Sequence, residues 1–182
     1  GNKIQSSGLL EFALPLHHAL GLATVLLPSL AKGGTVVMVS GLSIRSLTEL
    51  IERERATIFM GVPFVFALAV RMAEEEGVNH DISSLRLCVS AGAAMPPDIM
   101  ERFKKCYGLD IVQYWGLTEA IGCVTYQPLD GTGKFNSAGR TLPRYELKVV
   151  DDSGKELPPN QVGEVAVRGL MMKGYYGNPQ AT

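Results

Sequence analysis

The stretch "YWGLTEA", residues 114–120, places two aromatic rings, a glycine, a hydroxyl and a carboxylate in close succession. Thr118 can donate a hydrogen bond to a phosphate oxygen. Glu119 offers an oxygen ligand of the kind that Mg²⁺ takes together with substrate phosphates. Tyr114 or Trp115 can face a flat base, and Gly116 lets the chain turn close to it. From these residues alone, a magnesium–phosphate site and a pair of core rings followed by an exposed helix-start carboxylate are both open interpretations.

A second stretch, "SAGAAMP" at residues 90–96, joins a predicted strand to a predicted helix. Its small side chains, Gly92, Ala93 and Ala94, would let a flat ligand approach the backbone. Ligands in open α/β sheets bind at the carboxyl ends of the strands, where this turn is expected. The alternative is a tight strand-to-helix turn without a ligand, because small-residue turns are common.

Adjacent histidines, His17 and His18, follow the first apolar run in "PLHHALG". Neighbouring side chains point in different directions, so the pair is a poor two-ligand metal motif. We expect one of them to orient an anionic substrate or to control its access. The alternative is a surface histidine beside a partly buried one.

Composition and missing motifs exclude several classes of protein. A formal net charge of −1 argues against binding to nucleic acid, and no apolar stretch is long enough for a membrane span. Three cysteines without CxxC spacing indicate free thiols in a reducing, cytoplasmic protein. The sequence contains no GxxxxGK[ST], no GxGxxG after a strand and no GxSxG, so three common catalytic templates fail.

The elements that must position these residues follow from hydrophobic periodicity. After a short apolar run at 11–16, the patterns predict helices at 19–34, 43–56, 63–77 and 96–108, and strands at 35–39, 57–62, 85–92 and 109–115. Repeated strand–helix units of this length predict an α/β fold with a mostly parallel sheet and helices on both faces.

The pattern changes after about residue 125. Residues 127–144 are rich in glycine, proline and asparagine and are predicted to form a loop. Residues 145–169 alternate as two strands around an Asp-Ser-Gly turn, which predicts a small antiparallel β unit, an incomplete barrel. We therefore expect an α/β subdomain at 1–143 and a partial β-barrel subdomain at 144–182.

Taken in order, the motifs resemble the adenylate-forming (AMP-binding) superfamily, in particular its acyl-CoA synthetases and fatty-acid–CoA ligases. The resemblance covers nearly the whole chain and is carried by "LPLHHALGL", "GGTVVM", "GVPFVFALA", "SAGAAMP", "YWGLTEA", "SAGRTLP", "LKVVDDSGKELPPNQVGEVAVRG" and "KGYYGNP". It implies a two-step reaction with ATP, Mg²⁺ and CoA. A carboxylic acid, expected to be a fatty acid, first forms an acyl-adenylate, and CoA then displaces AMP.

The resemblance also implies roles for individual residues. Trp115 takes the position of an aromatic that stacks on adenine, with Gly92, Ala93 and Ala94 on the other side of the base, and Tyr114 and Gly116 belong to the same nucleotide-binding segment. Thr118 matches a hydroxyl that contacts phosphate, Glu119 the carboxylate associated with Mg²⁺, and His18 a histidine near the acyl carboxylate. The residues just past Glu119, "AIGCV" at 120–124, are expected to line part of the acyl pocket, and the small Gly122 and Cys123 among them are compatible with a long or bulky acyl group.

Two substitutions depart from the family pattern. Trp115 stands where tyrosine is usual, which keeps stacking but removes a phenolic hydrogen bond, and Ala94-Met95 replaces the commoner Pro-Leu. The family's phosphate loop, a ribose-binding Thr-Gly-Asp and a catalytic lysine are missing. We therefore expect a central fragment that is inactive alone and that self-associates through exposed apolar surface.

Two alternatives to the ligase stay open. The first keeps the fold but changes the second step, as in an adenylation domain that passes the acyl group to a carrier protein or in an oxidising, luciferase-like enzyme. The second is a non-catalytic relative that binds a nucleotide or serves as a scaffold. The paired Thr118 and Glu119 argue against the scaffold.

Overall fold

A mostly parallel sheet of seven strands organises the described part of the chain, with strand order β2-β1-β3-β4-β5-β6-β7. The computed structural model describes residues 8–12, 16–39, 43–134 and 136–182. The strands are β1 (Gly8–Phe12), β2 (Thr35–Val39), β3 (Ile58–Gly61), β4 (Leu87–Ser90), β5 (Ile111–Trp115), β6 (Thr125–Tyr126), β7 (Arg140–Thr141), β8 (Glu146–Val150) and β9 (Glu164–Arg168). The helices are η1 (Leu20–Leu26), α1 (Leu27–Ala31), α2 (Ile44–Glu54), α3 (Pro63–Glu76), α4 (Pro97–Tyr107) and the short η2 (Thr118–Ala120).

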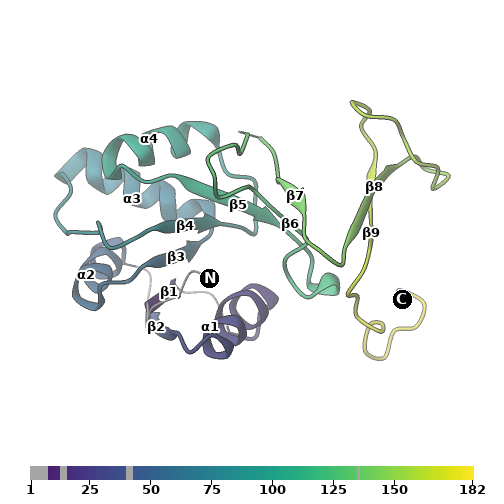
Figure 1. Cartoon of the computed structure of the whole chain (residues 1–182), viewed down its shortest axis with the longest axis horizontal. Coiled ribbons are helices and arrows are strands. Elements are labelled where there is room, and N and C mark those ends of the chain that lie inside the picture. The colour runs from purple at the N-terminus through teal and green to yellow at the C-terminus, as the bar shows by residue number, and fades with distance from the viewer. Residues whose placement is uncertain (1–7, 13–15, 40–42, 135) are drawn as a thin grey trace.

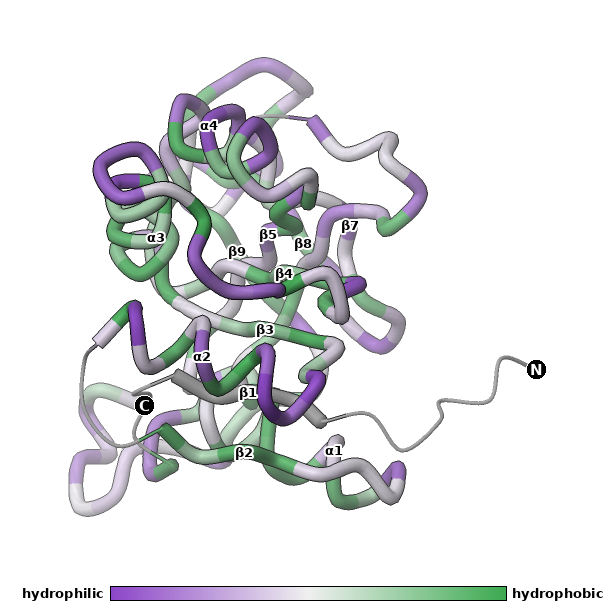
Figure 2. The backbone as a smooth tube through the Cα atoms, turned by 90° about the vertical axis from the view of Figure 1, so that its left-hand side faces the viewer, coloured by the Kyte–Doolittle hydropathy of each residue, from purple (hydrophilic) through white to green (hydrophobic). Residues whose placement is uncertain are grey.

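The first five strands pair in parallel, as predicted, whereas β6 and β7 add to the edge in the antiparallel direction. Figure 2 shows β4, β3, β1 and β2 following one another across the sheet. Of the apolar run predicted at 11–16, residues 13–15 lie outside the described residues, and the strand itself covers Gly8–Phe12. The sheet thus places the carboxyl ends of β3, β4 and β5 along one edge.

Helices cover both faces of the sheet, which confirms the predicted fold class (Figure 1). One face carries α2, α3 and α4 over a core that centres on Phe66, which packs against the rings of Phe59 and Phe103. The other face carries η1, whose Leu20 and Val25 pack against residues of β3 and β4. These two cores hold the strand ends, and therefore the loops that follow them, in fixed positions.

The helix boundaries follow from local sequence signals. Pro63 and Pro97 begin α3 and α4, where a missing N–H costs nothing. Gly77 and Gly108 end these helices in conformations with positive φ. The helix predicted at 19–34 is instead a seven-residue π-helix, η1, that continues directly into α1.

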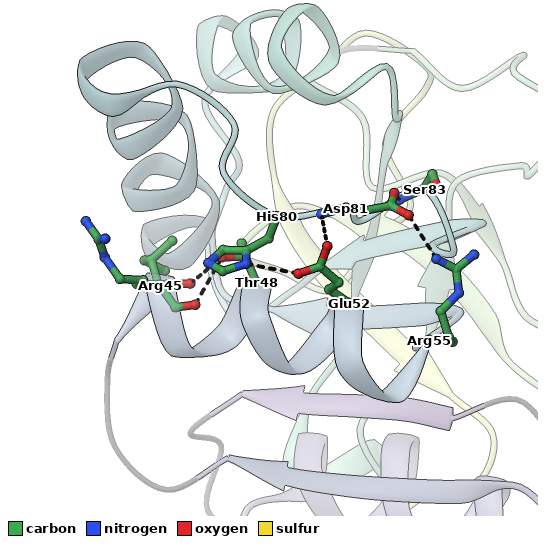
Figure 3. A network of polar contacts seen from close by, with 8 residues as sticks. Arg45, Thr48, Glu52, Arg55, His80, Asp81 and Ser83 are labelled. Carbon is green, nitrogen blue, oxygen red and sulfur yellow. Dashed lines mark hydrogen bonds and ion pairs between the residues drawn. The ribbon is translucent and has the colours of Figure 1, made fainter.

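A surface network of polar contacts fastens α2 to the segment before β4 (Figure 3). The Glu52 carboxylate accepts a 3.0 Å hydrogen bond from the Asp81 backbone N–H and lies 3.2 Å from His80 Nδ1. Arg55 donates to the Asp81 carboxylate at 2.9 Å. These contacts fix the approach of the chain to β4.

The strands β8 and β9 form a separate antiparallel hairpin, in line with the predicted small β unit. The predicted Asp-Ser-Gly turn forms, with the Gly154 N–H donating to the Asp151 carbonyl at 2.8 Å. It does not close the hairpin, however, because residues 151–163 make a longer connection in which Leu157 N–H returns to Val149 O. Figure 1 shows this hairpin at the end of the molecule beyond β6 and β7.

None of the helices in the described ranges is long and apolar enough to cross a membrane.

Candidate functional site

Two loops meet at the carboxyl edge of the sheet, where the sequence predicted a site. Ser90 at the end of β4 pairs in parallel register with Gln113 of β5, so the segments that follow these strands leave the sheet side by side. The Gln113 side-chain oxygen accepts a 3.2 Å hydrogen bond from Met95 N–H. This bond ties the small-residue turn of residues 91–96 to β5.

The loop after β5 is closed tightly by backbone hydrogen bonds. Gly122 N–H donates to Leu117 O at 2.8 Å, and Val124 N–H donates to Trp115 O at 2.9 Å. A Cβ atom at Gly116 would lie 1.5 Å from Gly122 O, so only glycine fits there. The loop therefore presents Thr118 and Glu119 from a constrained turn.

A cavity of about 470 Å³ opens beside the ring of Trp115, and we call it the tryptophan pocket. It is lined by Gly92, Ala93, Ala94, Met95, Gln113, Tyr114, Trp115, Gly116, Asn136, Ser137 and Ala138. The turn after β4 forms one wall and β5 another. Because Gly92, Ala93 and Ala94 of this turn carry small or no side chains, the backbone there is accessible to a flat group.

A second cavity, of about 300 Å³, adjoins the first, and we call it the glutamate pocket. Its lining comprises His18, Ala19, Leu20, Ala91, Gly92, Tyr114, Gly116, Leu117, Thr118, Glu119 and Gly122. Gly92, Tyr114 and Gly116 line both cavities. The two pockets are therefore neighbours at the carboxyl edge of the sheet.

Every residue that the sequence assigned to the nucleotide, the phosphates, the metal or the acid carboxylate lines one of these pockets. His18, Thr118 and Glu119 lie in the glutamate pocket, and Ala93, Ala94 and Trp115 lie in the tryptophan pocket. The sequence separates His18 from Glu119 by 101 positions, and the fold brings them to one cavity. Their roles in binding and catalysis stay predictions.

Glu119 is held by the segment that follows β9. Its Oε1 accepts a 2.5 Å hydrogen bond from the Tyr175 hydroxyl, and its backbone carbonyl accepts a 2.7 Å bond from Met172 N–H. The hydrogen bond from the Tyr175 hydroxyl lowers the pKa of the Glu119 carboxyl below its ordinary value of 4.5, and a backbone N–H lowers it further. The carboxylate is thus ionised near neutral pH and suited to a cation.

His18 stands at the start of η1, with its side chain exposed. Its Nδ1 accepts a 3.1 Å hydrogen bond from the Leu20 backbone N–H. In the neutral ring the proton is then on Nε2, because Nδ1 is used as an acceptor. His18 consequently offers an N–H donor at the rim of the glutamate pocket.

Metal binding by protein groups alone has little support, since no group of three or more His, Cys, Asp or Glu side chains in the described residues can hold a metal ion. A single carboxylate beside a hydroxyl is the donor set that suits Mg²⁺ when substrate phosphates complete the coordination. Glu119 and Thr118 fit that arrangement.

Several pocket residues were not predicted. Gln113, Met95 and residues 136–138 line the tryptophan pocket, and Tyr175 contacts Glu119. Tyr175 belongs to the motif "GYYGNP", which the sequence flagged without a role. Gly122 lines the glutamate pocket, whereas Cys123 is absent from its lining and its thiol donates to Thr125 O at 3.4 Å. The predicted acyl-pocket role of this segment stays a prediction.

The parallel sheet and the two adjoining pockets at its carboxyl edge define an open α/β fold with a candidate ligand site. Residues 9–176 match the AMP-binding enzyme family, and the chain belongs to that family. A feruloyl-CoA synthase of Amycolatopsis sp. is 37% identical over 172 residues, which cover 93% of this chain and 34% of the relative.

Solved structures agree with this assignment. An anthranilate CoA ligase, AuaEII, in complex with anthranoyl-AMP superposes with a TM-score of 0.87 at 30% identity, over 96% of this chain and 34% of that one. A long-chain-fatty-acid-CoA ligase, FadD1, from Archaeoglobus fulgidus gives a TM-score of 0.83 at 27% identity, over 93% and 36% of the two chains. The chain spans about a third of the length of these relatives.

Proposed function

We propose that the chain carries the nucleotide- and acid-binding part of an ATP-dependent acid–CoA ligase. The observation that carries this proposal is the pair of joined pockets, which share Gly92, Tyr114 and Gly116. A nucleotide whose base occupies the tryptophan pocket would direct its phosphates toward the glutamate pocket. The family membership and the names of the relatives support the same class of reaction.

In this proposal the base lies between the Trp115 ring and the backbone of Gly92, Ala93 and Ala94. Thr118 donates its hydroxyl to a phosphate oxygen, and Glu119 helps to hold Mg²⁺ against the phosphates. The metal neutralises negative charge that develops on the phosphate oxygens. The position of all six residues in the lining of the two pockets supports these roles.

Two group transfers make up the proposed reaction. A carboxylate oxygen of the acid attacks the α-phosphorus of ATP, the bond from that phosphorus to the bridging oxygen breaks, and pyrophosphate leaves. The thiolate of CoA then attacks the acyl carbon, and AMP leaves with the electron pair of the broken C–O bond. His18, with its Nε2–H donor, would orient the carboxylate for the first attack.

The acid substrate is an organic carboxylic acid, and two classes of acid have support: fatty acids and aromatic acids. The sequence predicted a fatty acid, and FadD1 is named for long-chain fatty acids. The feruloyl-CoA synthase and the anthranilate CoA ligase are named for aromatic acids. Aromatic and fatty acids therefore both belong in the substrate panel.

The proposal is tested with the ligase that contains this chain, by measuring acid-dependent pyrophosphate release from ATP. Glu119→Ala should lower the release by on the order of 100-fold, since it removes a group that stabilises transition-state charge. Glu101→Ala, an exposed carboxylate on α4, is the matched control and should leave the rate unchanged. Equal rates of pyrophosphate release for the two variants would contradict the role of Glu119. If repeated turnover with AMP formation did not require CoA, the enzyme would use another acyl acceptor.

Four narrower proposals accompany this function. Residues 1–143 and 144–182 form separate subdomains, which the separation of the β8–β9 hairpin from the main sheet supports. The 182 residues alone do not complete the reaction, since they span a third of the relatives.

They self-associate through exposed apolar side chains such as Val162 and Val165, which sedimentation at increasing concentration would reveal. Three free cysteines support a cytoplasmic location.

A further inference from the structure

The turn that carries Glu119 is held by hydrogen bonds from the C-terminal part of the chain. Tyr145, just before β8, donates its hydroxyl to Ala120 O at 2.7 Å. After β9, Met172 N–H donates to Glu119 O at 2.7 Å, and the Tyr175 hydroxyl donates to Glu119 Oε1 at 2.5 Å. The first two bonds fix the backbone of η2, whereas the third acts on the carboxylate itself.

Tyr175 lies in a loop that is braced by its own hydrogen bonds. The Tyr175 N–H donates to Thr182 Oγ1 at 2.9 Å, and the Thr182 hydroxyl donates to Asn178 O at 3.0 Å. The Asn178 N–H in turn donates to Tyr175 O at 3.2 Å. These bonds close residues 175–182 into a compact loop, so the phenol approaches Glu119 from a fixed backbone.

The bond from Tyr175 restricts a side chain that would otherwise change rotamer freely. Glu119 is only half-buried, and it lines the glutamate pocket. Glutamate is among the residues that lose most rotamer freedom when they are ordered. A neutral hydroxyl donor on Oε1 orders the carboxylate without cancelling its charge. A ligand then binds more tightly, because the side chain is already ordered before the ligand arrives.

We propose that Tyr175 is a positioning residue that holds the Glu119 carboxylate ready for a divalent cation bound with the phosphates of ATP. The inference deepens the proposed function and rests on the role given there to Glu119. The residues that line the glutamate pocket do not include Tyr175, so it acts through Glu119 rather than on the ligand. Partners that orient metal-binding side chains typically contribute about 10–100-fold to metal affinity or activity.

The test measures the affinity of the ligase for ATP by calorimetry, without an acid substrate, once with Mg²⁺ and once with EDTA. Tyr175→Phe removes only the hydroxyl. It should weaken the binding of ATP with Mg²⁺ by on the order of 10-fold and leave the binding of ATP with EDTA unchanged. Tyr176→Phe is the matched control, because the Tyr176 side chain is fully exposed, and it should change neither affinity.

A double variant shows whether Tyr175 acts through Glu119. Glu119→Ala should itself weaken the binding of ATP with Mg²⁺. Adding Tyr175→Phe to Glu119→Ala should weaken this binding no further, since the effects of two contacting residues that act together are not additive. A further loss in the double variant would mean that Tyr175 acts on another group, and the proposal would be wrong.

Hydrogen exchange separates orientation of the carboxylate from docking of the segment. The bonds that Met172 and Tyr145 make to η2 do not involve the Tyr175 hydroxyl. Exchange of the Met172 amide should therefore be as slow in Tyr175→Phe as in the unmodified enzyme. Faster exchange there would show that the hydroxyl docks the segment after β9, which would overturn the positioning role.

The outcomes distinguish this inference from the proposed function. If Glu119→Ala leaves the binding of ATP with Mg²⁺ unchanged, the proposed metal role of Glu119 fails, and the role of Tyr175 fails with it. If Glu119→Ala weakens that binding whereas Tyr175→Phe leaves it unchanged or tightens it, the ligase proposal stands and the positioning role of Tyr175 is wrong.

Discussion

Replacement of Gly116 by alanine tests whether the loop that presents Thr118 and Glu119 must keep its observed shape. The backbone of Gly116 is not in the left-handed region, so alanine is not excluded by its φ angle. The obstacle is space, because the new Cβ would lie 1.5 Å from Gly122 O and 2.8 Å from the Cys123 Cα. The effect of the substitution therefore comes from a clash within the loop.

The size of the effect can be worked out from this clash. Cβ atoms do not come within 3.0 Å of such atoms, so the loop must open by at least about 1.5 Å, the difference between the two distances. Such a shift disrupts the bond from Gly122 N–H to Leu117 O. Overpacking of this kind costs about 1–3 kcal/mol. A displacement of about 1 Å at reacting groups lowers rates by on the order of 100-fold.

The assay is acid-dependent pyrophosphate release by the ligase, with thermal unfolding measured in parallel. Gly133→Ala is the matched control, since its Cβ would meet only ordinary contacts of 3.5 Å with the Gln127 side chain. We expect Gly116→Ala to lose on the order of 100-fold in kcat/KM while Gly133→Ala stays close to the unmodified enzyme. If Gly116→Ala kept its rate within about threefold, the geometry of the loop would not control Thr118 and Glu119.

Two further predictions concern stability. Phe66→Ala should lower the free energy of unfolding by about 3–5 kcal/mol, because the ring is fully buried between two other aromatic rings. Phe64→Ala, an exposed position on the same helix, should change it by less than about 0.5 kcal/mol. Equal urea midpoints for the two variants would contradict the assignment of the core. The Asp81 backbone N–H and then His80 lower the pKa of the Glu52 carboxyl below 4.5, so its stabilising contribution is complete above pH 4.5 and is lost as the pH falls through the lower folded value. Glu52→Gln should therefore lower the urea midpoint at pH 7 and have little effect on it at pH 3. Glu49→Gln, at an exposed neighbouring position, should change the midpoint at neither pH. If Glu52→Gln lowered the midpoint equally at pH 7 and pH 3, the proposed link between this carboxylate and stability would be wrong.

The parallel part of the sheet was predictable because its signals are local. Strands made of continuous β-branched residues, and helices that begin at a proline and end at a glycine, can each be identified within about a dozen residues. The rule that crossover connections are right-handed then leaves few possible strand arrangements. By contrast, β6 and β7 have two residues each, too few for any periodicity. The strand β6 pairs with β5, and β7 pairs with β6. The Gln127 side chain holds the loop between them by donating to Lys134 O and Ser137 O.

The site was predictable where residues follow adjacent strands. Both predicted loops, and His18, line the joined pockets because parallel strands bring their carboxyl ends to one edge. Contacts made through tertiary packing were not foreseen. The 3.1 Å contact between the hydroxyls of Tyr114 and Thr24 joins β5 to a π-helix, whereas the sequence pattern indicated only a helix over 19–34. Tyr175 reaches Glu119 only because the chain returns after β9.

The hydrogen bond from Tyr175 to Glu119 has a consequence for the order of assembly during synthesis. The two residues are 56 positions apart, and a chain is made and folded from its N-terminus. The strands β1–β5 and both pocket loops therefore leave the ribosome well before the partner of this carboxylate exists. Glu119 acquires its final surroundings only after the β8–β9 hairpin has formed and residues 172–175 have docked against η2.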